Sequence, residues 1–291
     1  MFLLQAIVPI KGFEKNMVWL DLWLPKVKDK RLHVSFILDN PTEPEWELAK
    51  AYLDVKCDFS FSVERVSVNS PGFARNSALH KIEASWICFW DADDYPEVSK
   101  IIQVLEGSHE DVVVFNFKVQ DVENFGGFIG HHWSRFHYLS LNQIGQFPGF
   151  WRMAFRSKTL QNVRFEKFRM GEDLDFLVQV NLQSQNIQFN NEVVYTYRKF
   201  VPLSLTQEPK ALAELPELIE SLESRIKISK MRNSFNYSLY FRSVISSYRY
   251  SGRSSGYVIV KLVVRLLSHP WTTVAGILRV LMVKPLEVRK R

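Results

Sequence analysis

The 291-residue chain is predicted to adopt an α/β fold, with a mixed, mostly parallel sheet flanked by helices and a C-terminal helical extension. Three observations predict this class. Apolar runs of strand length alternate with segments of helical periodicity as far as residue 198. The chain after residue 212 has a helical pattern. A hydrophobic content of 46% supplies a substantial core and excludes a largely disordered chain.

The elements are identified in order by periodicity and by turn residues. Residues 3–10 are an apolar first strand, and apolar residues then recur at helical spacing over 16–27. The D-N-P turn at 39–41 ends the second strand, and residues 86–90 are apolar enough for a strand buried on both faces. Strands are expected at residues 3–10, 31–38, 59–68, 86–90, 111–117 and 187–198, and helices at 16–27, 45–53, 74–84 and 171–180.

Charge divides the chain into two parts. Residues 225–291 carry 14 Lys and Arg and a single acidic residue, whereas the preceding residues hold 23 basic and 30 acidic groups. We therefore expect an α/β domain at residues 1–211 and a basic helical region at 212–291, which meet different partners. Residues 119–150, rich in Gly, Phe and His, are expected to form a long loop or a hairpin insert.

The two cysteines and the N-terminal segment bear on the compartment. Cys57 and Cys88 lie in or beside apolar strand-like runs, which favours reduced core residues of a cytosolic protein. Residues 1–10 lack the basic leader and small-residue cleavage site of a secretion signal. No uninterrupted apolar run reaches the roughly 18 residues of a spanning helix, so we expect none.

The most informative feature is a group of three carboxylates at the end of a predicted buried strand. Asp91, Asp93 and Asp94 directly follow the apolar run at 86–90. In open α/β sheets, ligands bind in the crevice at the carboxyl ends of the strands. Carboxylates this close repel one another, and a hard divalent cation such as Mg²⁺, Mn²⁺ or Ca²⁺ would relieve the repulsion. The alternative is a solvated Asp-rich turn before Pro96.

Several segments together resemble a family 2 glycosyltransferase with the nucleotide-diphospho-sugar transferase (GT-A) fold. They are A-I-V-P-I at 6–10, N-S-P-G-F-A-R-N at 69–76, F-W-D-A-D-D at 89–94, the run from W-R-M-A-F-R at 151 to G-E-D-L-D-F at 171–176, and Y-T-Y-R with S-L-T beyond at 195–206. The resemblance covers roughly residues 3–206, and its specificity comes from the order of these pieces.

The resemblance implies a nucleotide-sugar site, with UDP as the family default. Asp93 is expected to hold a divalent metal, Mn²⁺ or Mg²⁺, with help from Asp91, which lies nearer the ribose or sugar. Asp39 corresponds to the position that reads the base, and Pro9 belongs to the donor site. D-N-P-T at 39–42 and P-I-K-G at 9–12 depart from the family pattern and leave the base open.

Two roles remain open for each of two further residues of the predicted site. Arg75 is expected to reach the phosphates or the donor sugar through forked hydrogen bonds, or else to tie its helix to the end of the sheet. Asp94 either assists the metal or caps the next helix.

On the acceptor side, the resemblance makes Asp173 the general base, at the start of a predicted helix where an anion is favoured. Direct attack by the activated hydroxyl inverts the anomeric configuration. Glu172, Trp151 and Arg152 are expected to bind the acceptor. The alternatives are capping of the helix by the acidic pair and core packing of Trp151. Asp175 is interpreted as a solvated helix residue.

The basic C-terminal region is expected to dock on an anionic membrane. In residues 257–268, Lys261 and Arg265 form a narrow basic stripe on an otherwise apolar helical pattern, continued around Trp271 and by basic residues to 291. Each basic group near such a surface contributes about 1 kcal/mol. The alternative is a helical subdomain that packs on the acidic catalytic part. Nucleic acid is not expected as a partner, because no nucleic-acid-binding motif accompanies the charge.

The sequence and its resemblance thus predict an inverting, metal-dependent sugar transferase that uses a nucleotide-activated donor, with a UDP-sugar as the family default. Its acceptor would be a hydroxyl of a cell-surface glycan or a lipid-linked acceptor, at the cytoplasmic face of the membrane. Two other functions are open: a haloacid-dehalogenase-type phosphatase, and a non-catalytic membrane-docked binder of nucleotide or glycan.

Overall fold

The computed structural model describes residues 1–121, 130–131, 140–168, 170–199, 214–228, 233–251, 263–264, 267 and 270–281. The chain divides into two compact units. The first comprises residues 1–139, 150–169 and 185–204, and the second comprises 140–149, 170–184 and 205–291. The division into domains at residues 1–211 and 212–291 remains a prediction. Half of the predicted insert at 119–150, residues 122–129 and 132–139, lies outside the described residues.

The first unit is built on one mixed sheet in the order β3-β2-β1-β4-β8-β6-β9-β5, with β7 paired to β6. Its described strands are β1 (Phe2–Ile10), β2 (Leu32–Asp39), β3 (Ser60–Val66), β4 (Ala84–Phe89), β5 (Tyr95–Pro96), β6 (Val112–Asp121), β7 (Gly130–His131), β8 (Met153–Arg156) and β9 (Ile187–Lys199). Strands β3, β2, β1 and β4 are parallel, as are β6 and β9, whereas β8 is antiparallel to both neighbours. The predicted mixed, mostly parallel sheet is confirmed.

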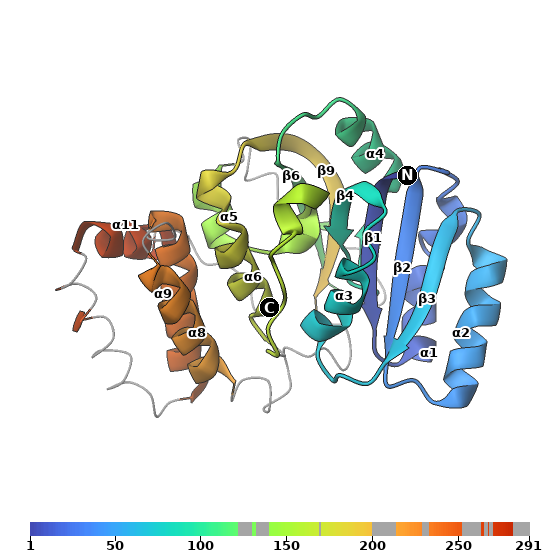
Figure 1. Cartoon of the computed structure of the whole chain (residues 1–291), viewed down its shortest axis with the longest axis horizontal. Coiled ribbons are helices and arrows are strands. Elements are labelled where there is room, and N and C mark those ends of the chain that lie inside the picture. The colour runs from blue at the N-terminus through green and yellow to red at the C-terminus, as the bar shows by residue number, and fades with distance from the viewer. Residues whose placement is uncertain are drawn as a thin grey trace. The chain divides into compact units, whose positions relative to one another are not determined.

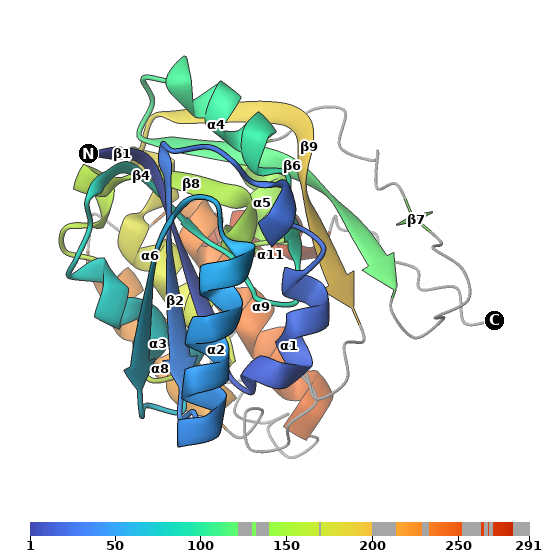
Figure 2. The same ribbon diagram turned by 90° about the vertical axis from the view of Figure 1, so that its right-hand side faces the viewer.

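The centre of the sheet is apolar because helices cover it. Leu4 and Ile7 of β1 and Trp86 and Ile87 of β4 are fully buried, as expected for strands enclosed on both faces. Helix α3 packs against β1 and β2 (Figure 1). Helices α1 and α2 contact each other and lie side by side in Figure 2. The α-helices described in this part are α1 (Phe13–Leu20), α2 (Glu43–Lys56), α3 (Pro71–Leu79) and α4 (Val98–Glu106).

Capping residues explain where these helices differ from the predicted ranges. Helix α3 begins at residue 71 because the Ser70 hydroxyl accepts a hydrogen bond from the Phe73 amide at 3.3 Å, and a proline occupies the first turn. The first helix ends at Leu20, and a short 3₁₀ turn at Leu24–Lys26 replaces the rest of its predicted length. Pro25 in that turn cannot donate a backbone hydrogen bond, so the α-helix cannot continue through it.

The described part of the second unit is helical, as predicted for the chain beyond residue 212. Its helices are α5 (Leu141–Gln146), α6 (Glu172–Val180), α8 (Leu215–Lys227), α9 (Ser234–Ser251) and α11 (Pro270–Leu281). Helix α8 packs on α6 and α9, and α9 also contacts α11 and α5. In the described residues, no helix has both the length and the apolar character needed to cross a membrane. Lys261 and Arg265 of the predicted basic stripe lie outside the described residues.

Candidate active site

The predicted acidic turn lies at the carboxyl edge of the parallel strands. Trp90 continues β4 by donating its amide to the carbonyl of Ile7 in β1 at 3.1 Å. The chain then turns, and the Asp94 amide donates to the Asp91 carbonyl at 3.1 Å. The Asp91 amide donates to the hydroxyl of Tyr195 on β9 at 3.1 Å. The turn is therefore held from two sides, by β1 and by β9.

Arg75 is an ion-pair partner of this turn. Its Nη2 lies 2.7 Å from Oδ1 of Asp91, and its own side chain is only 3% exposed, against 34% for Asp91. The guanidinium also lies 4.9 Å from the ring centroid of Phe150 and 5.6 Å from that of Phe165. The structure thus places Arg75 of α3 beside the acidic turn. The contact joins the end of β4 to α3, which is close to the structural alternative considered for this arginine.

Asp93 is a carboxylate of this turn whose ionised form is disfavoured. Burial raises the pKa of Asp93 to about 6, and the neighbouring charge of Asp91 adds to the rise, while Arg198 and Lys15 oppose it. The Asp93 carbonyl accepts a hydrogen bond from Nη1 of Arg198 at 2.7 Å. That donor therefore engages the backbone of Asp93. A carboxyl group with a raised pKa beside another carboxylate marks a place where an added cation would be favourable.

Asp94 faces the interior and does not cap the next helix. It is 1% exposed, and its Oδ1 accepts a hydrogen bond from the Arg198 amide at 2.7 Å. Burial, followed by the charges of Asp93 and Asp91, raises its pKa well above the ordinary value. The N-cap of α4 is Glu97, and no side-chain hydrogen bond caps it. The capping alternative is wrong because Asp94 joins the turn to β9.

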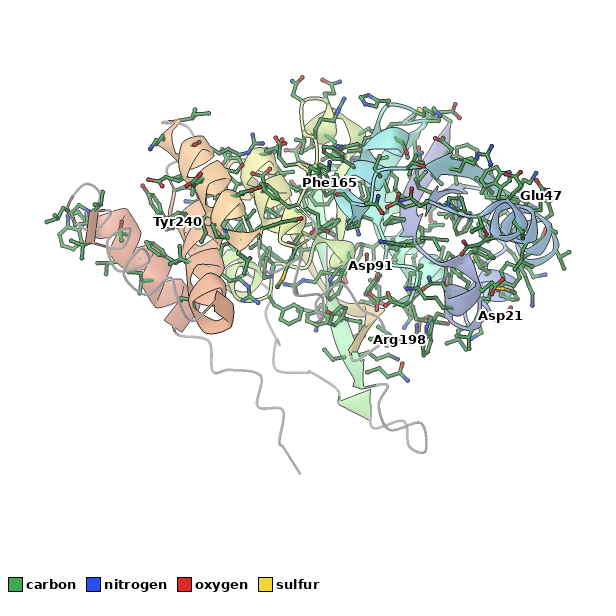
Figure 3. The ribbon with its side chains drawn as sticks, turned by 90° about the horizontal axis from the view of Figure 1, so that it is seen from below. Asp21, Glu47, Asp91, Phe165, Arg198 and Tyr240 are labelled. Carbon is green, nitrogen blue, oxygen red and sulfur yellow. The ribbon has the colours of Figure 1, made fainter. Side chains whose placement is uncertain are left out.

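Arg198 is a residue of this turn's surroundings that the sequence pattern does not identify, although it belongs to the Y-T-Y-R segment. It is 6% exposed, and its Nε donates to the Gln120 side chain at 3.2 Å while its guanidinium lies 4.9 Å from the Trp19 ring. Figure 3 labels Asp91 and Arg198, both residues of the first unit. The one available signal was the alternation of Tyr and polar residues along β9, which places Thr196 and Arg198 on the same face.

The carboxylates of this turn offer oxygen ligands to a divalent metal. Within the described residues, no group of three or more His, Cys, Asp or Glu side chains could hold a metal. Mg²⁺, however, is bound through one or two protein carboxylates together with substrate phosphates. Asp94 accepts from the backbone of β9, which leaves Asp91 and Asp93 as the candidate ligands. These two oxygen donors, with the raised pKa of Asp93, fit a hard divalent cation that arrives with a diphosphate.

Asp39 and Pro9 lie at the same edge of the sheet. Strand register pairs Pro9 with Ile37, and Asp39 ends β2 two residues later. Oδ1 of Asp39 accepts from the amides of Val68 at 2.9 Å and Asn69 at 3.1 Å. Asp39 is 6% exposed, and its hydrogen bonds to these two amides hold the turn that leads into α3. Contact with a nucleobase remains a prediction for this residue.

Trp151 and Arg152 are core residues of the first unit. Trp151 is 7% exposed and stacks on the rings of Tyr195 and Tyr197, with centroid distances of 4.7 and 5.0 Å. Arg152 is 1% exposed, its guanidinium lies 4.9 Å from the Phe117 ring, and burial lowers its pKa to about 9. These contacts support the core-packing alternative for Trp151, and an acceptor role for either residue remains a prediction.

Glu172 and Asp173 occupy the first turn of α6, in the second unit. The N-cap is Gly171, which has φ 82° and offers no side chain to the helix. Oδ1 of Asp173 accepts from the Leu174 amide at 2.9 Å, so the carboxylate lies where helix amides favour an anion. The interpretation of Asp175 as solvated is wrong: it is fully buried and pairs with Arg225, whose Nε lies 2.7 Å from its Oδ1.

Comparison with solved structures gives relatives of the same fold. The chain resembles the S. aureus TarS 1–349 structure in complex with UDP-GlcNAc, with a TM-score of 0.62 and 17% identity over 96% of this chain and 82% of that one. It also resembles the mannosyltransferase PcManGT from Pyrobaculum calidifontis in complex with GDP-Man and Mn²⁺, with a TM-score of 0.52 and 13% identity over 96% of this chain and 86% of that one. A search of curated proteins gave no match.

At these identities the solved structures establish the fold alone, and they confirm the predicted GT-A architecture. The family is established by a separate comparison. The model described as glycosyl transferase family 2 matches residues 22–170, just over half of the chain. That match spans β2 to β4, the acidic turn and Arg75. The chain therefore belongs to glycosyl transferase family 2.

Proposed function

We propose that this glycosyltransferase moves a sugar from a UDP-sugar to a hydroxyl of a cell-surface glycan or lipid-linked acceptor, with inversion at the anomeric carbon. The observation that carries the proposal is the acidic turn at the carboxyl edge of the parallel strands, where Asp93 has a raised pKa beside Asp91. This arrangement favours a ligand that brings positive charge with it. A nucleoside diphosphate bound with its cation meets that requirement.

On the donor side, Asp93 and Asp91 would hold Mn²⁺ or Mg²⁺. When bound, the cation would offset the negative charge of the diphosphate leaving group. Arg75 keeps the Asp91 carboxylate in place through the 2.7 Å ion pair. Asp39 and Pro9 would contact the nucleoside. Support for a nucleotide-sugar donor comes from family membership and from the UDP-GlcNAc and GDP-Man complexes of the two structural relatives.

On the acceptor side, Asp173 would act as the general base. As the acceptor oxygen forms its bond to the anomeric carbon, the bond from that carbon to the diphosphate breaks and its electron pair leaves with the diphosphate. The hydroxyl proton passes to the Asp173 carboxylate. Base assistance of this kind contributes about 10²–10⁴-fold to the rate. Glu172, Trp151 and Arg152 would contribute to acceptor binding.

The test measures release of UDP from UDP-GlcNAc, UDP-glucose and UDP-galactose in the presence of Mn²⁺ or Mg²⁺. GDP-mannose is assayed in parallel as a donor with a different nucleotide. The proposal predicts turnover that Asp93→Ala and Asp173→Asn each abolish, while Asp173→Asn still binds UDP. NMR of the product would show the inverted anomeric configuration. Near-normal turnover by Asp173→Asn would refute the base assignment, and the absence of turnover with every donor would favour the non-catalytic binder. Family membership removes the phosphatase from consideration.

We also propose that the second unit docks on an anionic membrane, at the cytoplasmic face. Its described residues leave apolar side chains exposed, with Leu267 at 81% and Trp271 at 85%, and the chain from 225 to 291 is strongly basic. An apolar face beside basic residues is typical of interfacial helices. Sedimentation with phosphatidylglycerol vesicles tests this. Binding should fall in Trp271→Ser and with phosphatidylcholine alone, and equal binding to both vesicle types would refute the electrostatic part.

A further inference from the structure

A buried ion pair fixes the helix that carries the predicted base. Asp175 of α6 is fully buried, and its Oδ1 accepts from Nε of Arg225 at 2.7 Å and from the hydroxyl of Ser221 at 2.9 Å. Both donors belong to α8, which lies beside α6 (Figure 1). The other carboxylate oxygen accepts from the Gln179 side chain, one turn later on α6, at 2.7 Å. The carboxylate is therefore held by three donors.

A second contact fixes the beginning of the same helix. Gly171 has φ +82°, and a Cβ placed on it would clash with Cδ2 of Leu218. The end of the Leu218 side chain on α8 therefore occupies the space that a Cβ at position 171 would need. Leu218, Ser221 and Arg225 are spaced by three and four residues, so they share one face of α8. One face of α8 thus holds α6 at two points.

These contacts set the direction in which the base points. Successive residues of an α-helix are rotated by about 100°, so positions 173 and 175 lie on roughly opposite sides of α6. Fixing Asp175 against α8 turns Asp173 away from α8. A purely apolar contact would bury α6 equally well but would tolerate small rotations, whereas hydrogen bonds to three donors do not. The ion pair between Asp175 and Arg225 therefore fixes the rotation of α6 about its axis as well as its burial.

We propose that Arg225 and Ser221 are positioning residues, which act through Asp175 to hold Asp173 in its catalytic orientation. The inference rests on the proposed function for the role of Asp173. It also assigns a task to α8, a helix of the C-terminal region, that lies outside the residues matched by the family model. The C-terminal region would then serve catalysis as well as membrane docking.

The test compares three full-length variants. Arg225→Met removes the ion pair but keeps most of the aliphatic length, and Arg225→Lys keeps the charge. The matched control is Asn233→Ala, which removes a 2.8 Å hydrogen bond from Asn233 to Asn181 at the opposite end of α6. Each variant is characterised by its unfolding midpoint, by hydrogen exchange of the 172–176 amides, and by UDP release from UDP-GlcNAc in saturating metal.

For Arg225→Met we expect at least tenfold faster exchange of the first-turn amides of α6, with the control unchanged there. Turnover should fall about 10- to 100-fold at constant donor KM, because small displacements of a catalytic group have effects of this size. Arg225→Lys should recover part of both. Unchanged exchange in Arg225→Met, or an equal loss of turnover in Asn233→Ala, would overturn the inference. If the wild type releases no UDP, the proposed function fails, while exchange still decides whether α8 holds the helix.

Discussion

Replacing Asp93 by asparagine is expected to stabilise the metal-free protein at neutral pH. Burial, reinforced by the charge of Asp91, raises the pKa of Asp93 from 3.8 to about 6. The folded protein therefore binds this proton more tightly than the unfolded chain does, so stability falls as pH rises from about 4 to about 6. The cost is fully present above pH 6. A difference of about two pKa units corresponds to about 3 kcal/mol, which a neutral amide does not incur.

The assay is urea unfolding of wild type and Asp93→Asn in EDTA, at pH 7.5 and at pH 4.0. The variant should be more stable by about 1–3 kcal/mol at pH 7.5, and the difference should vanish at pH 4.0. The control is Asp58→Asn, because hydrogen bonding to Lys30 lowers the pKa of Asp58 and removal of that carboxylate should have the opposite sign. A variant less stable than wild type at pH 7.5, or equally stabilised at both pH values, would refute the reasoning.

Three further outcomes are expected. Arg75→Met should lower the free energy of unfolding by about 1–3 kcal/mol in urea titrations at pH 7.5, because it removes the 2.7 Å ion pair to the Asp91 carboxylate; an unchanged free energy of unfolding would contradict this. Gly171→Ala should lower the free energy of unfolding by about 1–3 kcal/mol in the same assay, because alanine is strained at a left-handed backbone position and its Cβ meets Leu218. Adding Leu218→Ala to this variant should remove the clash but not the backbone strain. Burial raises the pKa of both cysteine thiols, so iodoacetamide at pH 8 should leave them unmodified by mass spectrometry until urea is added.

The parallel half of the fold could be predicted because each of its strands carries its own signal. The apolar runs that became β1 and β4 are buried on both faces, and such runs are visible without knowledge of their neighbours. The antiparallel part was harder to predict. Strand β8 has only four residues, Met153–Arg156, too few to establish a period. Helix α4 was not predicted, although Ile101, Ile102 and Leu105 form its buried face.

The candidate site also has a part that the sequence predicts and a part that it does not. The acidic turn was visible because its carboxylates are adjacent in the sequence, but their partners were not. Arg198 contacts the Asp93 carbonyl across 105 residues, and Arg225 contacts Asp175 across 50. Local pattern carries no information on which distant cation a carboxylate will meet. The wrong interpretation of Asp175 follows from this, because an acidic residue on a helix is most often solvated unless a partner is known.

The three carboxylates of the acidic turn therefore have different tasks, although they look equivalent in the sequence. Asp94 is buried and accepts the Arg198 amide, which fixes the turn to β9. Asp91 is paired with Arg75, which fixes the turn to α3. Asp93 lies between these two attachments, and its pKa stays raised although Arg198 and Lys15 oppose the rise. Fixing its neighbours prevents the turn from relaxing to separate the charges, so relief of the charge on Asp93 must come from a proton or from a bound cation.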